Sequence, residues 1–160
     1  MLDLETFKGV VKNTNLFAFD LILTNDKNEI LLGLRENQPA KGFWFVPGGR
    51  IFKNEKLIEG LERILLCEIG LSIQDLSDLH VYGLYDHLYE NNYFLDPSFD
   101  THYIICCLKA NVKKDKHPKT SIQHSKLTFF SINDLLNNVF VHEFTKNYFK
   151  ENPLNKFPVI

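Results

Sequence analysis

The fold is decided by residues 48–55, GGRIFKNE, and residues 63–71, RILLCEIGL, which seven residues separate. The first stretch reads as a glycine loop and the second as a helix. Asn54 is a suitable N-cap, and Glu55 suits the first turn, where a carboxylate interacts favourably with the helix dipole. Gly70 is a typical C-terminal stop. We therefore expect a glycine loop that leads into a helix running from about residue 55 to Ile69.

One carboxylate of this helix has an unusual predicted position. Leu57, Leu61 and Ile64 form the core stripe on a helical wheel at about 100° per residue. Glu68 points about 20° from Leu57 on the same wheel. A carboxylate that packs inward is costly unless it is paired, so it needs a cation, and a metal ion is one candidate. The alternative is that the helix ends near Gly70 and Glu68 turns to solvent.

Length and composition exclude several classes of protein. The chain has 160 residues, which suggests a single domain over 1–160, and its formal net charge of -2 lacks the footprint of a general nucleic-acid binder. No run approaches about 18 apolar residues, so we expect no membrane span. The first residues lack the pattern of a signal peptide, and Cys67, Cys106 and Cys107 make no disulfide framework. These features predict a cytoplasmic protein without a nucleic-acid or membrane partner.

The rest of the chain alternates strands with a few helices. Strands mixed with segregated helices favour an α+β fold over a doubly wound parallel sheet. Asp3 is a possible N-cap for a first helix, Pro47 should stop the third strand, and a polar, aromatic loop is expected over Tyr89–Asp100. The expected strands are Leu16–Thr24, Glu29–Leu34, Phe43–Val46, His80–Leu88, His102–Val112 and Lys126–Phe130, with helices near Leu4–Val11, Ile132–Leu136 and Phe144–Phe149.

The loop–helix stretch resembles the signature of the Nudix hydrolases, G-x5-E-x7-R-E-U-x-E-E-x-G-U, where U is a bulky aliphatic residue. The matching positions are Gly49, Glu55, Arg63, Leu65, Glu68, Gly70 and Leu71. Ile64 and Cys67 stand where the signature has glutamates. The resemblance implies an α/β/α sandwich in which a loop–helix–loop motif lies above a mixed β-sheet. It also implies that Arg63 pairs with Glu55 and fixes the turn.

A narrower resemblance extends over nearly the whole chain. The GDP-mannose mannosyl hydrolases are a Nudix subfamily that lacks the same two glutamates, and this chain is similar to them. The similar positions are Phe7, Asp20–Ile22, Leu31–Arg35, Asn37, Pro39–Ala40, Gly42–Arg50, His87, Tyr89, Thr101–Tyr103, Gln123–His124 and Val141–His142. The resemblance implies Mg²⁺-dependent cleavage of the sugar C1–O bond of a GDP-sugar with inversion, giving GDP and free sugar. It also implies a homodimer.

The same resemblance implies a role for each of several residues. One Mg²⁺ per active site would be held by the Gly48 carbonyl, Glu68 and Gln123, and His124 would be the general base. Arg35 and Arg50 would stabilise the departing diphosphate, where negative charge builds up. Asp20 and His87 would lie near the sugar. Phe7 would lie near the nucleobase, Tyr103 near the diphosphate, and Tyr89 would contact the substrate.

Two other functions stay open at this point. The chain could cleave the phosphoanhydride of a nucleotide sugar, as a Nudix pyrophosphohydrolase does, but the two missing glutamates argue against this. It could also be a non-catalytic nucleotide-sugar binding module, which the joint retention of Arg35, Arg50, Glu68, Gln123 and His124 disfavours. The segment 89–100 and the C-terminal part diverge most from the subfamily, so they leave the identity of the sugar open.

Overall fold

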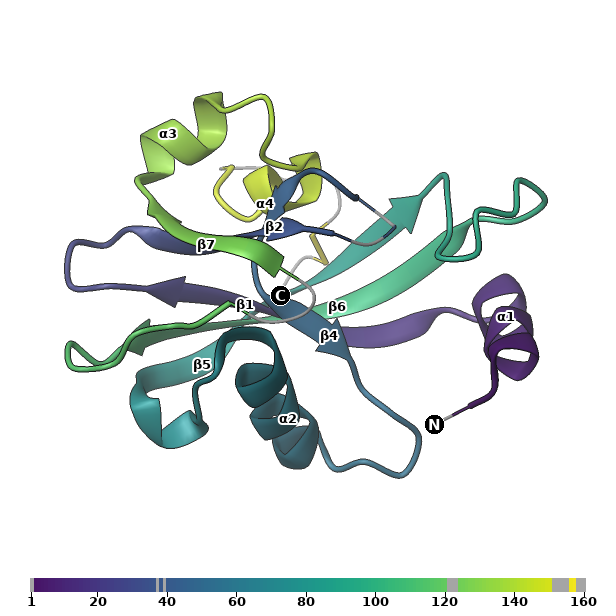
Figure 1. Ribbon diagram of the computed structural model, residues 1–160, viewed down its shortest axis with the longest axis horizontal. Coiled ribbons are helices and arrows are strands. Elements are labelled where there is room, and N and C mark those ends of the chain that lie inside the picture. The colour runs from purple at the N-terminus through teal and green to yellow at the C-terminus, as the bar shows by residue number, and fades with distance from the viewer. Residues whose placement is uncertain (1, 37, 39, 121–123, 151–155, 158–160) are drawn as a thin grey trace.

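A computed structural model describes residues 2–36, 38, 40–120, 124–150, 156 and 157. These residues form a mixed sheet with helices, an α+β fold, as expected (Figure 1). The strands are β1 Leu16–Thr24, β2 Ile30–Arg35, β3 Trp44–Phe45, β4 Gly48–Arg50, β5 Leu76–Tyr89, β6 Thr101–Val112 and β7 His124–Phe130. The helices are α1 Leu4–Asn13, α2 Leu57–Ile69, α3 Ile132–Asn137 and α4 Glu143–Asn147, with a 3-10 helix at Ile73–Asp75.

The sheet splits beside its central strand, β1. Along one side β1 runs parallel to β6, from Leu16↔Tyr103 to Thr24↔Asn111, and β5 extends the sheet antiparallel to β6. Along the other side β1 has two different neighbours. It pairs with β2 at Thr24↔Ile30 and with β4 opposite residues 18–20. Because β2 turns away to pair with β3 and β7, an opening is left between β2 and β4.

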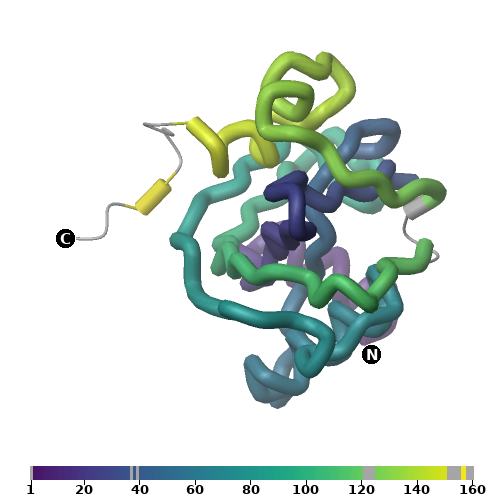
Figure 2. The backbone as a smooth tube through the Cα atoms, turned by 90° about the vertical axis from the view of Figure 1, so that its left-hand side faces the viewer, coloured from purple at the N-terminus to yellow at the C-terminus, as the bar shows by residue number. Residues whose placement is uncertain are grey.

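Helices cover both faces of the sheet. Helix α2 lies on one face, and α3 and α4 lie on the other, while α1 stands at one end (Figure 1). The view from the side shows the same separation, with α2 at the bottom and the C-terminal helices at the top (Figure 2). One apolar core packs α2 against residues such as Phe19 and Leu21, and a second core packs Ile22 against Leu135. Strand β1 is thus buried on both faces, which explains its nearly continuous apolar sequence.

The start of α2 differs from the prediction. The N-cap is Lys56, and Asn54 has a φ of 66°, a left-handed conformation that an N-cap does not adopt. Glu55 therefore lies in the loop and not in the first helical turn. Leu57 is the first helical residue and is 56% exposed, so the core stripe begins one turn later, at Leu61. Glu68 is only 3% exposed, so it does not turn to solvent before the helix ends.

The other elements lie near their predicted positions, although β5 begins at Leu76 and not at His80 and includes Tyr89, and one more correction concerns Pro47. The Asp3 side chain caps α1 by accepting a hydrogen bond from the Thr6 amide at 2.9 Å, as expected. Pro47 ends β3 but not the sheet, because the three residues after it form β4 against β1. Cys106 and Cys107 are buried in β6 and Cys67 is exposed. No helix among the described residues is long and apolar enough to cross a membrane.

Two glycines, one at the end of a helix and one inside a helix, allow a matched test of stability. Gly70 caps α2 with a φ of 68° and donates its amide to the Leu66 carbonyl, whereas Gly9 lies inside α1 with open space around its Cα. Gly70→Ala should lower the free energy of unfolding by about 1–2 kcal/mol, because a left-handed conformation is strained for alanine. Gly9→Ala should raise it by up to about 1 kcal/mol, since alanine favours a helix interior. Urea denaturation measures both, and an unchanged stability of Gly70→Ala would contradict the assigned cap.

Candidate active site

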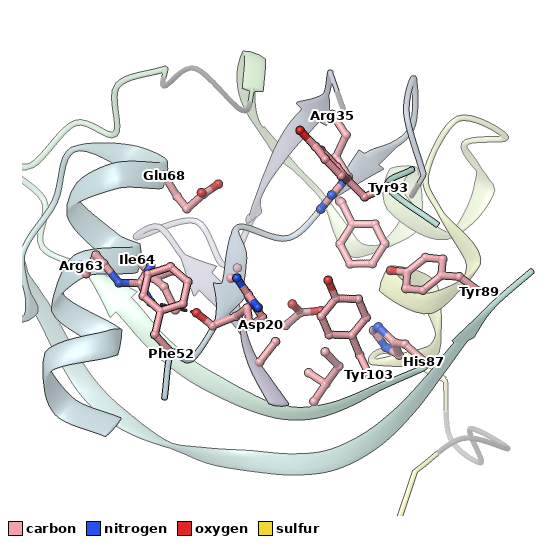
Figure 3. A pocket seen from close by; sticks show the side chains of 16 residues that line it. Asp20, Arg35, Phe52, Arg63, Ile64, Glu68, His87, Tyr89, Tyr93 and Tyr103 are labelled. Carbon is pink, nitrogen blue, oxygen red and sulfur yellow. Dashed lines mark hydrogen bonds between the residues drawn. The ribbon is translucent and has the colours of Figure 1, made fainter. Parts of the chain in front are cut away.

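A cavity of about 390 Å³ opens where the sheet splits (Figure 3). Figure 3 shows Glu68 and Arg63 at the α2 end, Asp20 and Tyr103 in the middle, and His87 at the far end. The lining residues are Ala18, Asp20, Arg35, Phe45, Gly48, Gly49, Arg50, Phe52, Arg63, Ile64, Glu68, His87, Tyr89, Tyr93, Tyr103 and Ile105. Eight of the eleven side chains or backbone groups expected at the site therefore line one cavity: Asp20, Arg35, Gly48, Arg50, Glu68, His87, Tyr89 and Tyr103.

The other three expected residues have different positions. Phe7 lies outside the cavity lining, with its ring 4.1 Å from the Arg50 guanidinium carbon and 5.7 Å from the Phe94 ring. Phe7 thus lies behind Arg50, and its contact with a nucleobase stays a prediction. The backbone of His124 is opposite Arg35 in the β2–β7 ladder, which brings β7 to the edge of the opening. Gln123 and the side chain of His124 lie outside the described parts of the structure.

An ion pair braces the loop between β4 and α2, as the sequence predicts. The Glu55 carboxylate accepts hydrogen bonds from Arg63 Nε at 2.6 Å and Nη2 at 2.8 Å, and from the Phe52 amide at 2.9 Å. Arg63 Nη2 also donates to the Arg50 carbonyl at 2.8 Å. The hydrogen bonds from Arg63 lower the pKa of Glu55 to about 2. The brace holds β4, which carries Gly48 and Arg50, at a fixed position relative to Glu68 on α2.

Gly48 and Glu68 bring oxygen donors to the cavity. The Leu21 amide donates to the Pro47 carbonyl and the Ile51 amide donates to the Phe17 carbonyl. Alternation along this antiparallel ladder makes Gly48 and Asp20 a non-hydrogen-bonded pair, so the Gly48 carbonyl points away from β1. A Cβ on Gly48 would lie 2.4 Å from Asp20 Oδ1, so only glycine fits there.

This donor set fits a magnesium ion better than a metal cluster. Within the described residues, no group of three or more His, Cys, Asp or Glu side chains could hold a metal ion. Glu68 is buried, yet it faces the cavity together with the Gly48 backbone. Mg²⁺ prefers hard oxygen ligands and accepts one or two carboxylates, completing its shell with water and substrate phosphate. A carboxylate and a carbonyl are therefore suitable protein ligands.

Two arginines make the middle of the cavity cationic. The Nε of Arg35 is buried and has no hydrogen-bond partner among the described residues, and its guanidinium carbon lies 5.7 Å from the Phe45 ring. Arg50 is held between the rings of Phe7 and Phe52. Burial lowers the pKa of Arg50, but an arginine remains charged in proteins. A buried guanidinium nitrogen without a partner fits an anionic ligand, such as a phosphate, which would satisfy it.

A buried polar cluster runs from Asp20, in the middle of the cavity, to His87 at its far end. Tyr148 Oη donates a hydrogen bond to Asp20 Oδ2 at 2.5 Å and lies 3.1 Å from His87 Nε2. Asp20 is 6% exposed, and His87 and Tyr148 are each 1% exposed. Burial raises the pKa of Asp20 to about 7, although Tyr148 and Arg35 favour its ionised form. Burial and, to a lesser degree, His142 lower the pKa of His87 to about 3, so this imidazole is neutral at physiological pH.

Sequence reasoning missed Tyr148, and it included Tyr93 only as part of the aromatic stretch 89–94, a candidate for contact with the substrate. Tyr148 comes from the C-terminal segment, which diverges from the subfamily and has no local pattern that marks a site. Tyr93 reaches the cavity because the segment after β5 is built around Asn92, which is buried. Its side-chain amide donates to the Asp96 and Phe99 carbonyls at 2.7 Å each. Asparagine is common in such turns, so Asn92 was the one sequence feature that indicated an ordered turn here.

Comparison with known proteins agrees with this fold. The family description "NUDIX domain" matches residues 14–151. The chain therefore belongs to the Nudix hydrolase family, and the braced loop, α2 and the split sheet are its Nudix motif and core. Divalent ions such as Mg²⁺ are the metals that Nudix hydrolases generally use.

Three similar proteins illustrate the range of the family. The low-salt glycan biosynthesis protein Agl8 of Haloferax volcanii is 33% identical over 126 residues, which cover 79% of this chain and 77% of that protein. A MutT Nudix hydrolase from Burkholderia pseudomallei has a TM-score of 0.68 at 20% identity, covering 85% of this chain and 96% of its own. The Nudix domain of Shewanella oneidensis NrtR, solved with ADP ribose, has a TM-score of 0.64 at 18% identity, covering 94% and 92%. The two solved structures support the fold alone.

The brace predicts a specific pH dependence of stability. Because the pKa of Glu55 is lowered from 4.5 to about 2 on folding, its charge stabilises the protein fully above about pH 5, and this contribution is lost as the pH falls through 4.5 towards 2. Glu55→Gln keeps the shape and removes the charge. The difference in unfolding free energy between wild type and variant should therefore be constant near pH 7 and shrink in acid. Urea titrations from pH 7 to pH 2.5 measure it; a difference that does not change with pH would contradict the brace.

Proposed function

We propose that the chain is a Mg²⁺-dependent nucleotide-sugar hydrolase that cleaves the sugar C1–O bond by attack of water with inversion, with GDP-mannose as the best substrate candidate. One observation carries this proposal. Of three α2 positions at which the signature has glutamates, only Glu68 offers the cavity a carboxylate, while Ile64 lines the cavity with an apolar side chain and Cys67 is exposed. Ile64 and Cys67 replace signature glutamates. A site with so little ligand charge suits a single ion better than the cluster that phosphoanhydride cleavage uses in this family.

Magnesium would be held by the Gly48 carbonyl and Glu68, with Gln123 as the third protein ligand. When bound, Mg²⁺ would neutralise part of the charge of the substrate diphosphate and so make it a better leaving group. Glu68 is fixed on α2 and Gly48 on β4, and the Glu55–Arg63 brace holds these two elements together. Gly48 and Glu68 would thus be positioned for the ion before any substrate arrives.

Arg35 and Arg50 would bind the diphosphate. Negative charge develops on the β-phosphate as the C1–O bond breaks, and prepositioned guanidinium groups stabilise it. The burial of Arg35 Nε inside the cavity supports this role, since a phosphate oxygen would supply the missing acceptor. Tyr103 lines the cavity near Arg35, Arg50 and Asp20 and is a further phosphate contact in this proposal.

The sugar would occupy the end of the cavity lined by Asp20, His87 and Tyr89. A carboxylate and a neutral imidazole can accept hydrogen bonds from sugar hydroxyls, and the Asp20 carboxylate can stabilise an oxocarbenium-like transition state. His124 would remove the proton from the attacking water, which an imidazole does well near neutral pH. The pairing of its backbone with Arg35 supports a position near the cavity.

One relative supports a sugar-containing substrate. The Haloferax volcanii protein is named for glycan biosynthesis, and it is 33% identical over most of this chain. A glycan-related role agrees with a nucleotide sugar as substrate, because glycans are built from activated sugars. The divergent segment around Tyr93 lies beside the same cavity, so the particular sugar depends on residues specific to this chain.

The position of bond cleavage tests the proposal directly. A panel of GDP-, UDP- and dTDP-sugars is incubated with the protein and Mg²⁺ in ¹⁸O-water, and the products are identified by mass spectrometry. We expect nucleoside diphosphate and free sugar, with the label in the sugar. Label in a phosphate, with nucleoside monophosphate as product, would establish the pyrophosphohydrolase alternative. Saturable binding of GDP-sugars without turnover would establish the binding module.

The ligand role of Glu68 is tested by metal titration. Glu68→Gln keeps an oxygen donor but removes its charge, so the Mg²⁺ concentration for half-maximal activity should rise by at least about tenfold. The matched control is Glu59→Gln, an exposed residue in the first turn of the same helix. Its metal dependence should equal that of the wild type. Wild-type metal dependence in Glu68→Gln would exclude this carboxylate as a ligand.

A further inference from the structure

Tyr148 links the two polar side chains at the sugar end of the cavity, although it does not line the cavity itself. It is the C-cap residue of α4, and its hydroxyl lies 2.5 Å from Asp20 Oδ2 and 3.1 Å from His87 Nε2. Asp20 is on β1 and His87 on β5, so the hydroxyl bridges two strands that β6 separates. A shift of Tyr148 would therefore disturb both cavity residues at once.

The number of protons in this cluster fixes the direction of each hydrogen bond. A tyrosine hydroxyl has one hydrogen, and above its pKa of about 7 the Asp20 carboxylate is ionised and can only accept. The short contact to Asp20 therefore takes the Tyr148 hydrogen. Towards His87 the same oxygen can then only accept, so the neutral imidazole must have its hydrogen on Nε2. The other ring nitrogen, Nδ1, is left with a lone pair.

Packing holds the cluster in one arrangement. The His87 ring stacks on Phe144, with centroids 4.2 Å apart and planes at 12°. The Tyr148 ring packs edge-on against Tyr85 at 4.7 Å, and the Tyr82 hydroxyl donates to the Tyr148 carbonyl at 3.0 Å. Tyr148 is thus fixed by β5 as well as by α4. The Tyr148 hydroxyl therefore cannot readily turn towards other hydrogen-bond partners.

We propose that Tyr148 is a positioning residue that keeps the proton of His87 on Nε2 and orients the Asp20 carboxylate, so that this end of the cavity presents hydrogen-bond acceptors to the hydroxyls of the substrate. This role rests on the nucleotide-sugar hydrolase proposed above. It deepens that function by giving the sugar end of the cavity a preference for ligands that carry hydroxyl donors. Ligands with neighbouring hydroxyl donors, as in a hexose, satisfy two acceptors, whereas a deoxygenated sugar leaves one unsatisfied.

The test compares Tyr148→Phe with Tyr85→Phe. Both rings are almost fully buried and pack against each other, but the Tyr85 hydroxyl has no hydrogen-bond partner in the described part of the chain. Tyr85→Phe therefore removes a buried hydroxyl without touching Asp20 or His87. Circular dichroism and thermal unfolding establish that both variants fold before any other comparison.

The first readout is the protonation of His87 in the free protein, without substrate or metal. Long-range ¹H–¹⁵N spectra at pH 8.5, with His87 assigned through His87→Gln, distinguish a protonated ring nitrogen from an unprotonated one. Wild type and Tyr85→Phe should show the hydrogen on Nε2. Tyr148→Phe should show Nδ1–H or a mixture of the two tautomers. An Nδ1–H wild type, or a Tyr148→Phe spectrum identical to the wild type, would overturn the proposal.

The second readout is activity on the best nucleotide sugar of the panel. Tyr148→Phe should lower kcat by about 10- to 100-fold with a much smaller change in KM, since misplaced groups act mainly on the transition state. Tyr85→Phe should keep wild-type kcat, and wild-type kcat in Tyr148→Phe would overturn the positioning role. If the wild type hydrolyses no nucleotide sugar, the proposed function fails, while the spectra still decide the state of His87 by themselves.

Discussion

The hydrogen bonds of one guanidinium hold the candidate active site together. Arg63 reaches from α2 to the Glu55 carboxylate and to the Arg50 carbonyl, and so it ties the helix to β4 and to the loop between them. Strand β4 has only three residues, and on its own it would have few contacts to determine its position. With the brace in place, Gly48 and Arg50 of β4 and Glu68 of α2 line the same cavity.

The cavity brings groups of different charge close together. Glu68 and the Gly48 carbonyl supply oxygen donors, Arg35 and Arg50 supply positive charge, and Asp20, His87 and Tyr148 form a buried polar cluster. Asp20 on β1 lies directly opposite Gly48 on β4, while Arg35 comes from β2, the other neighbour of β1 on this side. A substrate with a metal-bound diphosphate and a neutral, hydroxylated part would match these groups.

Short-range patterns in the sequence predicted much of the fold and site. The apolar run of β1, the cap at Asp3 and the stop at Gly70 depend on neighbouring residues, and the structure agrees with them. The start of α2 was mispredicted because Asn54 takes a left-handed conformation within a loop that Arg63 organises from eight residues beyond Glu55. Tyr148 could not be found, since its partner Asp20 lies 128 residues earlier and only tertiary packing brings them together.

The bonding of the segment between β5 and β6 affects how the substrate preference of this enzyme can change. Asn92 organises the segment through the segment's own backbone, and the ion pair between Lys8 and Asp96, at 2.8 Å, ties it to α1. One hydrogen bond, from Thr101 Oγ1 on β6 to the Asn91 carbonyl at 2.9 Å, ties it to the sheet. Its internal bonds therefore do not depend on the strands that hold the reactive groups. Insertions or exchanges here can diversify substrate preference during evolution, or in the laboratory, while the hydrolytic machinery stays intact.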